Sequence, residues 1–288
     1  METKFQVFDS LLHPTGKPAD LWTIGLRPIP WLSFGVLTMP DDARVKELAL
    51  AMEPGTVTMW DLELWDTAEW DYGLDHMVVN EENLAKQVNA MRIVRANQVA
   101  DTQFGTFGEF PRKYLNVSTY DYDHHRRAAY RELHVDLAIL PSLVDILFPE
   151  MYPAIGPHYD AGIDRWKADA TIQMNQMSEC SNTTYAYLMP SLNWLVSPAI
   201  YVSGDYWRAQ LEWCWDHPQI DGVVLFRVPE LAPNLWDGTA AWWLATLAFL
   251  ATHGLNVPAP KYQFRIDRPS RSSVARIGES SLITKVGE

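Results

Sequence analysis

Two acidic residues, Asp61 and Glu63, follow a stretch of the chain, residues 55–60, that has the apolar and β-branched character of a strand. Residues two positions apart in a strand point to the same face, about 7 Å from each other along the chain. Like charges at this spacing repel, and the repulsion favours the protonated form of one carboxyl group. The spacing predicts an acid/base site at the end of a strand, with Glu63 exchanging the proton and Asp61 beside it.

Acidic, amide and aromatic side chains also stand where other strand-like segments end. They are Trp65, Glu109, Glu150 with Tyr152, Asn193 with Trp194, and Phe226. In a parallel barrel the carboxyl ends of the strands meet at one face, and that face holds the reactive groups. We therefore expect these residues to surround Asp61 and Glu63, with Trp65 and Trp194 stacking on sugar rings.

Strand-like and helix-like segments alternate through most of the chain, which is typical of βα units and a parallel sheet. The predicted strands are residues 5–8, 29–34, 55–63, 103–110, 144–152, 185–194 and 222–228. The predicted helices are residues 40–52, 80–98, 122–140, 161–177, 206–215 and 239–251, and a long acidic loop is expected over residues 65–80. The pattern predicts an α/β fold, a TIM-like (β/α) barrel of seven or eight parallel strands.

We expect one domain, the barrel, over residues 1–257, and a peripheral or partly disordered tail over residues 258–288, where the chain becomes polar. Hydrophobic residues make up 48% of the sequence, which is ample for a packed core. The 13 Trp and 12 Tyr residues fill the core or line a carbohydrate cleft. Trp242 and Trp243 lie in a helical core pattern and are predicted to be buried.

The formal net charge of −13 argues against nucleic acid as a partner and makes a strongly anionic polymer a poor substrate. The N-terminus lacks an apolar signal core and no apolar run is long enough to span a bilayer, so we expect no membrane association. A cytoplasmic location is the default expectation, with secretion by another route left open. Composition leaves the oligomeric state open.

The sequence contains no glycine-rich phosphate loop and no nucleophile elbow, so no cofactor is predicted. His124 and His125 are adjacent on a predicted helix and point in different directions, so we expect no metal site there. The two cysteines, Cys180 and Cys214, are too few for a disulfide framework and are predicted to be free thiols.

Four segments resemble the hyaluronidases, in the same order along the chain. Residues 61–65 resemble the Asp-x-Glu-x-Trp motif of that family, and residues 104–116, 147–153 and 222–226 resemble further segments of its barrel. The resemblance implies a glycosidase on a seven-stranded barrel. It also implies that Glu63 is the general acid/base, that Asp61 orients the substrate acetamido group as the internal nucleophile, and that Tyr152 contacts that sugar.

The chain departs from the family pattern at several positions. Phe226 stands where the family has Trp, Glu150 stands where it has Ser, the Tyr expected after Pro190 is missing, and so are the paired cysteines. The added carboxylate leaves a second mechanism open, in which Glu150 or Glu109 is the nucleophile or base opposite Glu63. Two further alternatives are a carbohydrate-binding barrel without catalysis, and metal-dependent hydrolysis with Asp61 and Glu63 as ligands.

Overall fold

The computed structural model describes residues 5–11, 16–33, 41–61, 68–71, 76–108, 110, 137–153, 162–191, 201–227 and 236–258. The strands are β1 (Gln6–Leu11), β2 (Leu26–Pro28), β3 (Trp31–Ser33), β4 (Val57–Asp61), β5 (Ala68–Asp71), β6 (His76–Val79), β7 (Gln103–Phe107), β8 (Ile146–Phe148), β9 (Thr183–Leu188) and β10 (Gly222–Arg227). The helices are η1 (Leu21–Ile24), α1 (Asp42–Leu50), α2 (Glu81–Asn97), α4 (Ile139–Leu143), α5 (Gly162–Gln176), α6 (Gly204–Asp216) and α7 (Ala241–Thr252).

Eight of these strands form one sheet in which every neighbouring pair is parallel. Its order is β2-β1-β10-β9-β8-β7-β4-β3. The two strands at the ends of this order, β2 and β3, are successive in the chain and are separated by Ile29 and Pro30 alone. They are two halves of one extended segment, so the sheet returns on itself as a barrel with seven strand positions. The predicted TIM-like barrel is confirmed.

Proline explains the break between β2 and β3. Pro28 and Pro30 have no N–H group and cannot donate to a sheet ladder. The carbonyl of Pro30 still accepts from the amide of Met59, at 3.1 Å, which carries the pairing onward to β4. The predicted strand at residues 29–34 therefore exists as the short β3 together with β2, which begins earlier than expected.

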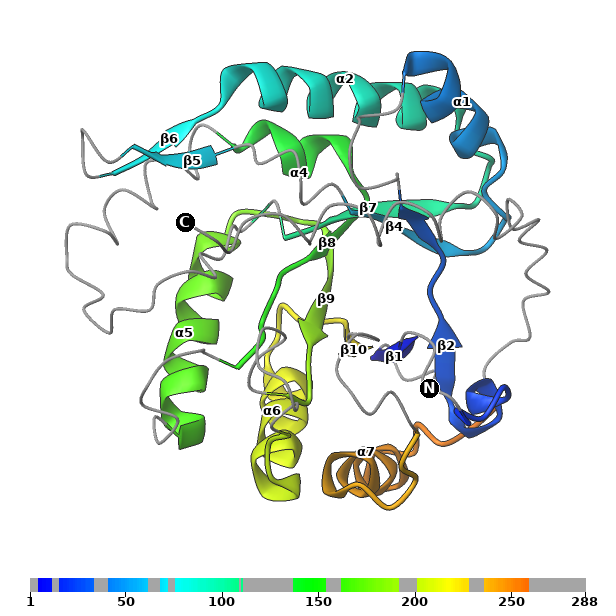
Figure 1. Cartoon of the computed structure of the whole chain (residues 1–288), viewed down its shortest axis with the longest axis vertical. Helices are drawn as coiled ribbons and strands as arrows, with labels where there is room; N and C mark the ends of the chain where they lie inside the picture. Colours follow the sequence, from blue (N-terminus) through cyan, green and yellow to red (C-terminus); the bar gives the residue numbers. More distant parts are fainter. Residues whose placement is uncertain are drawn as a thin grey trace, which may run out of the picture.

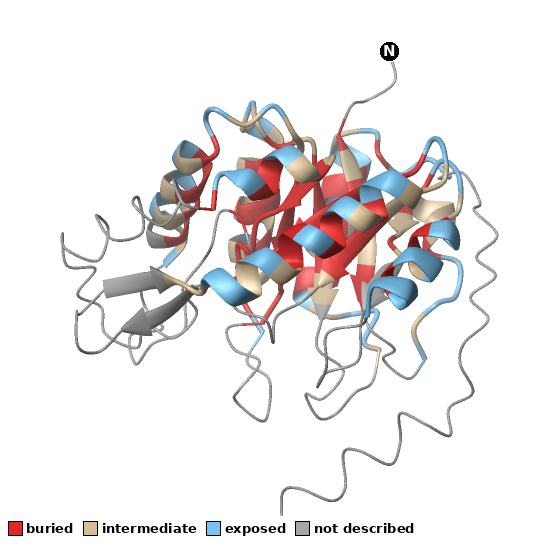
Figure 2. Ribbon diagram, turned by 90° about the horizontal axis from the view of Figure 1, so that it is seen from above, coloured by how far each residue is buried: buried red, intermediate tan, exposed pale blue. Residues whose placement is uncertain are grey.

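Helices surround the strands (Figure 1). In this view α1, α2 and α4 lie above the sheet and α5, α6 and α7 lie below it. Buried residues are concentrated in the strands and on the inward sides of the helices (Figure 2). Local sequence explains where the helices begin, because the side chains of Asp41, Asn80 and Ser203 each accept a hydrogen bond from the first turn of α1, α2 and α6.

Alternating strand residues form two apolar cores, one inside the barrel and one outside it. We call the first the inner core; its buried members are Phe8, Ile29, Met59, Phe107, Ile146, Phe148, Tyr152, Tyr185, Tyr187, Met189 and Val224. The intervening strand residues, such as Trp60, Leu147 and Val223, pack in the outer core with the helices. Large side chains fill the lumen, as expected for a small barrel.

One predicted feature differs from the structure, and two others fall on residues that it does not describe. The loop expected over residues 65–80 contains an antiparallel hairpin, in which β5 pairs with β6 from Ala68 opposite Val79 to Asp71 opposite His76. These strands pair with each other and not with the barrel, so no βα alternation reveals them. The helix expected over residues 122–140 lies almost wholly outside the described residues, and α4 begins at Ile139. The predicted tail, from residue 259 onward, also lies outside them.

Candidate active site

Asp61 ends β4 on the inner face of the barrel. Met59, two residues earlier, belongs to the inner core, whereas Trp60 packs in the outer one. Because strand residues alternate between faces, Asp61 shares the inner face with Met59. It is half-buried and stands opposite Ser33 in the last pair of the β3–β4 ladder. The structure thus places this carboxylate at the carboxyl end of a barrel strand, where the active sites of such barrels lie.

Glu150 and Tyr152 follow β8 at the same end of the barrel. Both are buried, with 4% and 5% of their surfaces exposed. Tyr152 belongs to the inner core and Met151 to the outer one, so Glu150 has the register of an inner-face residue. Backbone bonds to β9 hold the segment, because Tyr187 donates to the carbonyl of Pro149 at 2.9 Å and accepts from the amide of Met151 at 2.9 Å.

Two side chains of α5 hold the same segment from outside the barrel. The indole Nε1 of Trp166 donates to the carbonyl oxygen of Met151 at 2.8 Å, and Nε2 of Gln173 donates to that of Glu150 at 3.0 Å. Both donors are buried. Buried carbonyl groups near the end of a strand need hydrogen-bond donors, and α5 supplies one to each of these two. The backbone that carries Glu150 and Tyr152 is therefore fixed on two sides.

Aromatic rings cover the inner wall beside Glu150. The rings of Tyr152 and Phe226 are stacked, with centroids 5.7 Å apart and planes inclined by 10°. Tyr187 contacts both of them, at centroid distances of 6.4 Å to Tyr152 and 5.5 Å to Phe226. Phe107 lies 4.6 Å from Tyr187 and completes the group. Phe226 is half-buried whereas the other three rings are buried, so Phe226 is the ring of this group best placed to meet the apolar face of a sugar.

The structure describes four of the predicted site residues. Asp61, Glu150, Tyr152 and Phe226 all lie on the inner face toward the carboxyl ends of the strands, and of these Tyr152 and Phe226 are in contact. The remaining predicted residues, Glu63, Trp65, Glu109, Asn193 and Trp194, lie outside the described residues, so their placement remains a prediction. Trp242 and Trp243, predicted to be buried, have 3% and 5% of their surfaces exposed.

Sequence reasoning missed Tyr187 and Ser10. Their hydroxyl groups are hydrogen-bonded at 2.8 Å, and both residues are buried. The signal for Tyr187 was present, since Tyr185 and Tyr187 are spaced like inner-face residues of a predicted strand. Nothing in the sequence connects either tyrosine to Ser10, which is 177 positions from Tyr187.

Within the described residues, no group of three His, Cys, Asp or Glu side chains could hold a metal ion. None of the helices in that part of the chain combines the length and hydropathy needed to cross a bilayer. Cys214 is buried and Cys180 half-buried, and both are free thiols. Burial raises the pKa of each thiol, so both stay protonated near neutral pH.

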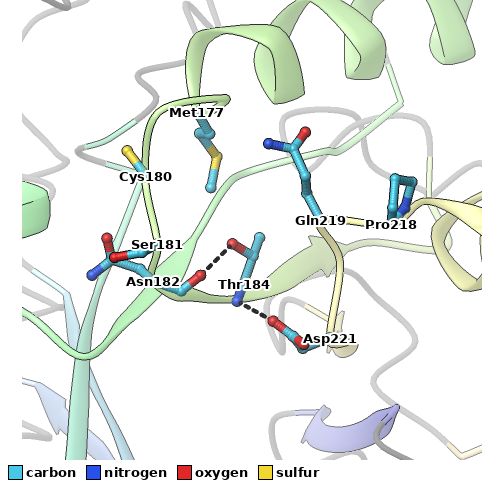
Figure 3. A pocket seen from close by; sticks show the side chains of 8 residues that line it. All are labelled: Met177, Cys180, Ser181, Asn182, Thr184, Pro218, Gln219 and Asp221. Carbon is cyan, nitrogen blue, oxygen red and sulfur yellow. Dashed lines mark hydrogen bonds between the residues drawn. The ribbon is translucent and has the colours of Figure 1, made fainter.

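A pocket of about 180 Å³ lies at the opposite end of the barrel, where β9 and β10 begin (Figure 3). Thr184 and Asp221 line it, and Asp221 accepts a hydrogen bond from the Thr184 amide at 3.1 Å. Cys180, Ser181 and Gln219 are among the other lining residues. In (β/α) barrels the amino-terminal face of the strands serves stability, so we place the candidate active site at the other end.

No family model matches the sequence, and no curated protein matches it either. Solved structures do match. A crystal structure of bee venom hyaluronidase superimposes with a TM-score of 0.55 and 11% identity, covering 86% of this chain and 97% of that one. A complex of bee venom hyaluronidase with a hyaluronic acid tetramer gives a TM-score of 0.56 and 12% identity, covering 86% and 96%.

At such low identity the likeness establishes a common fold. It confirms the distant resemblance to the hyaluronidases that the motif at residues 61–65 suggested. Other matching structures are also named as glycoside hydrolases, among them a GH18 chitinase from Pseudoalteromonas aurantia with a TM-score of 0.45 and 13% identity, covering 78% of this chain and 77% of that one. With a TM-score below 0.5, we infer nothing from that match.

Proposed function

We propose that this chain is a glycoside hydrolase in which Glu63 is the general acid/base and Asp61 assists it. The observation that carries the proposal is the position of Asp61, on the inner face at the carboxyl end of β4. Glu63 follows two residues later, and the Asp-x-Glu-x-Trp motif is the one that the hyaluronidases carry on the third barrel strand. Cleavage of a glycosidic bond needs a carboxylic acid that protonates the leaving oxygen.

The first mechanism is substrate-assisted. Asp61 orients the acetamido group of the substrate, whose oxygen attacks the anomeric carbon while Glu63 protonates the departing oxygen. Tyr152, stacked on Phe226, supplies the wall against which the sugar is held. This mechanism requires a 2-acetamido sugar and no second protein carboxylate as nucleophile.

The second mechanism uses two protein carboxylates. Glu150 supports it, because this carboxylate is buried on a fixed backbone at the same end of the barrel as Asp61. Glu109 is the other candidate. A separation of about 5 Å between the carboxyl groups of Glu63 and its partner predicts retention of configuration, and roughly 6.5–9.5 Å predicts inversion.

The proposed substrate is a carbohydrate that carries little negative charge. The net charge of −13 opposes the approach of a polyanion. One bee venom hyaluronidase structure contains a hyaluronic acid tetramer. In the present chain, Asp61 and Glu150 lie at the carboxyl ends of the barrel strands. Two acidic residues at this end favour a neutral or acetamido-bearing oligosaccharide.

Glu63→Gln tests the proposal directly. The amide cannot donate or accept the proton in the transition state, so kcat should fall by about 10²–10⁴-fold while substrate binding persists. Activity is measured on a panel of aryl glycosides with and without a 2-acetamido group. Glu47→Gln on α1, an exposed acid paired with Arg44, is the matched control and should leave kcat unchanged.

The two mechanisms make opposite predictions for Asp61 and Glu150. If the acetamido oxygen is the nucleophile, Asp61→Asn removes most activity, Glu150→Gln retains it, and substrates without the acetamido group are not cleaved. If Glu150 is the nucleophile, Glu150→Ala is inactive and azide restores turnover with formation of a glycosyl azide.

A third alternative is metal-dependent hydrolysis with Asp61 and Glu63 as ligands. Intact wild-type activity after chelation argues against it.

The rival without catalysis is a sugar-binding barrel. It predicts that the wild type cleaves none of the glycosides and that Glu63→Gln leaves oligosaccharide affinity unchanged. Isothermal titration with chitooligosaccharides and mannooligosaccharides, run beside the activity panel, separates binding from turnover. Binding without turnover by the wild type would reject the hydrolase proposal.

A further inference from the structure

Tyr187 occupies a central place in the wall of the candidate site. It lies in β9 with 1% of its surface exposed, and its backbone donates to Pro149 and accepts from Met151. These two bonds bracket Glu150, which forms a parallel bridge with Tyr187. Any shift of the β9 backbone at this residue is therefore transmitted to the backbone of Glu150.

The side chain of Tyr187 is fixed independently of its backbone. Its hydroxyl is hydrogen-bonded to Oγ of Ser10 on β1 at 2.8 Å. Strands β1 and β9 both flank β10, so this bond passes over β10 on the inner face of the barrel. Both residues are buried, and a hydrogen bond between buried hydroxyls fixes the ring more firmly than one open to water.

The fixed ring in turn supports the aromatic wall. Tyr187 lies between Phe107, at 4.6 Å, and Phe226, at 5.5 Å, and also contacts Tyr152. Ser10 stands opposite Phe226 in the β1–β10 register. The Ser10–Tyr187 hydrogen bond thus connects the strand beside Phe226 to the segment that carries Glu150 and Tyr152.

We propose that Tyr187, held by Ser10, is a positioning residue that sets where Glu150 and Tyr152 face the substrate; the catalytic part of this inference rests on the glycosidase function proposed above. Removing the hydroxyl leaves the ring in place but releases its orientation. The segment after β8 then samples positions that are unproductive for catalysis, and small displacements of this kind are costly to the chemical step.

The test compares Tyr187→Phe, Ser10→Ala and the double variant with the wild type. Tyr185→Phe is the matched control, because Tyr185 is an inner-core tyrosine of the same strand whose hydroxyl has no hydrogen bond among the described residues. We expect each single variant to lower kcat about tenfold with KM changed less than about twofold. The double variant should be no worse than either single one, since both remove the same bond.

Amide hydrogen exchange at Met151 provides a readout that does not depend on activity. We expect exchange there to be about tenfold faster in Tyr187→Phe and Ser10→Ala, and unchanged in Tyr185→Phe. Unchanged exchange in Tyr187→Phe overturns the proposal, as does a lower melting temperature with kcat unaltered in an active enzyme. If the wild type cleaves no glycoside, the hydrolase function fails separately, and exchange at Met151 still decides whether Tyr187 positions the segment.

Discussion

At the scale of single residues, some acidic side chains belong to the candidate active site and others stabilise the fold. Asp61 is half-buried at the carboxyl end of β4, whereas Glu150 has almost no exposed surface. Away from the site, Glu212 on α6 accepts from Arg208 at 2.5 Å and lies 2.7 Å from Nε2 of His253. Asp61 and Glu150 belong to the candidate active site, and Glu212 joins α6 to the end of α7.

Glu212→Gln should reduce stability in a way that depends on pH. Partial burial alone would raise the pKa of Glu212, but hydrogen bonds and charges from Arg208 and His253 outweigh it and lower the pKa. The stabilisation is therefore present above the ordinary carboxyl pKa of 4.5 and is lost as the pH falls through the lower folded-state value. Substitution should cost about 1 kcal/mol at neutral pH and little at the acid end.

Urea denaturation at a series of pH values checks this expectation. Glu47→Gln, which breaks the exposed Arg44–Glu47 pair of α1, is the comparison and should change stability by less than about 0.5 kcal/mol. A loss of stability in Glu212→Gln that is the same at every pH would contradict the ionic origin of the effect.

Among the helices and strands, α5 contributes more to the candidate site than its place outside the barrel suggests. Trp166 and Gln173 extend inward to the backbone carbonyls of Met151 and Glu150. Both contacts stabilise the segment that follows β8, in addition to its backbone bonds with β9. The helix thereby determines the local conformation of the chain next to the proposed substrate.

Gln173→Met should destabilise the protein by about 1 kcal/mol, because the buried hydrogen bond from Gln173 to the carbonyl of Glu150 is lost while the volume of the side chain is nearly kept. Gln176→Met on the same helix is the control, since Gln176 is half-buried and its side chain has no hydrogen bond among the described residues. Chemical denaturation measures both. Equal stability of the two variants would show that the Gln173 bond is not needed.

In the molecule as a whole, the barrel depends on a contact between regions far apart in the chain. Gly25 ends η1 with φ of 95° and leads directly into β2. A Cβ atom there would lie 1.9 Å from the carbonyl oxygen of Leu255, which follows α7. The close approach of these two backbones places the first part of the barrel against the last part.

Gly25→Ala should therefore destabilise the protein by about 3 kcal/mol or more, because backbone strain and a backbone clash act together. Gly254→Ala separates the two causes. Gly254 also has positive φ, 66°, but a Cβ there meets nothing within 4 Å. Its substitution should cost about 1 kcal/mol. Thermal unfolding of both variants is the measurement, and similar losses would exclude the clash as the main cause.

Particular residues show how much the sequence could predict. The helix predicted over residues 80–98 matches α2 to within one residue at each end, and Asn80 is its N-cap. The spacing of Asp61 and Glu63 predicted that they share one face of a strand end, and the structure gives Asp61 the register of the inner face. The loop predicted over residues 65–80 was wrong where β5 and β6 form, because these strands pair with each other and not with the barrel, and the acidic and aromatic residues of β5 resemble those of a loop.

Periodicity and short motifs are enough to predict a barrel of seven or eight strands, the place of Asp61 at a strand end, the shared face of Glu150 and Tyr152, and the resemblance to the hyaluronidases. Each of these features depends on interactions or spacings within a few residues of the chain. The folded structure is needed to learn that Ser10 bonds to Tyr187, that α5 holds the backbone after β8, and that Gly25 meets Leu255. Those contacts join residues far apart in the chain, so no spacing within one segment encodes them.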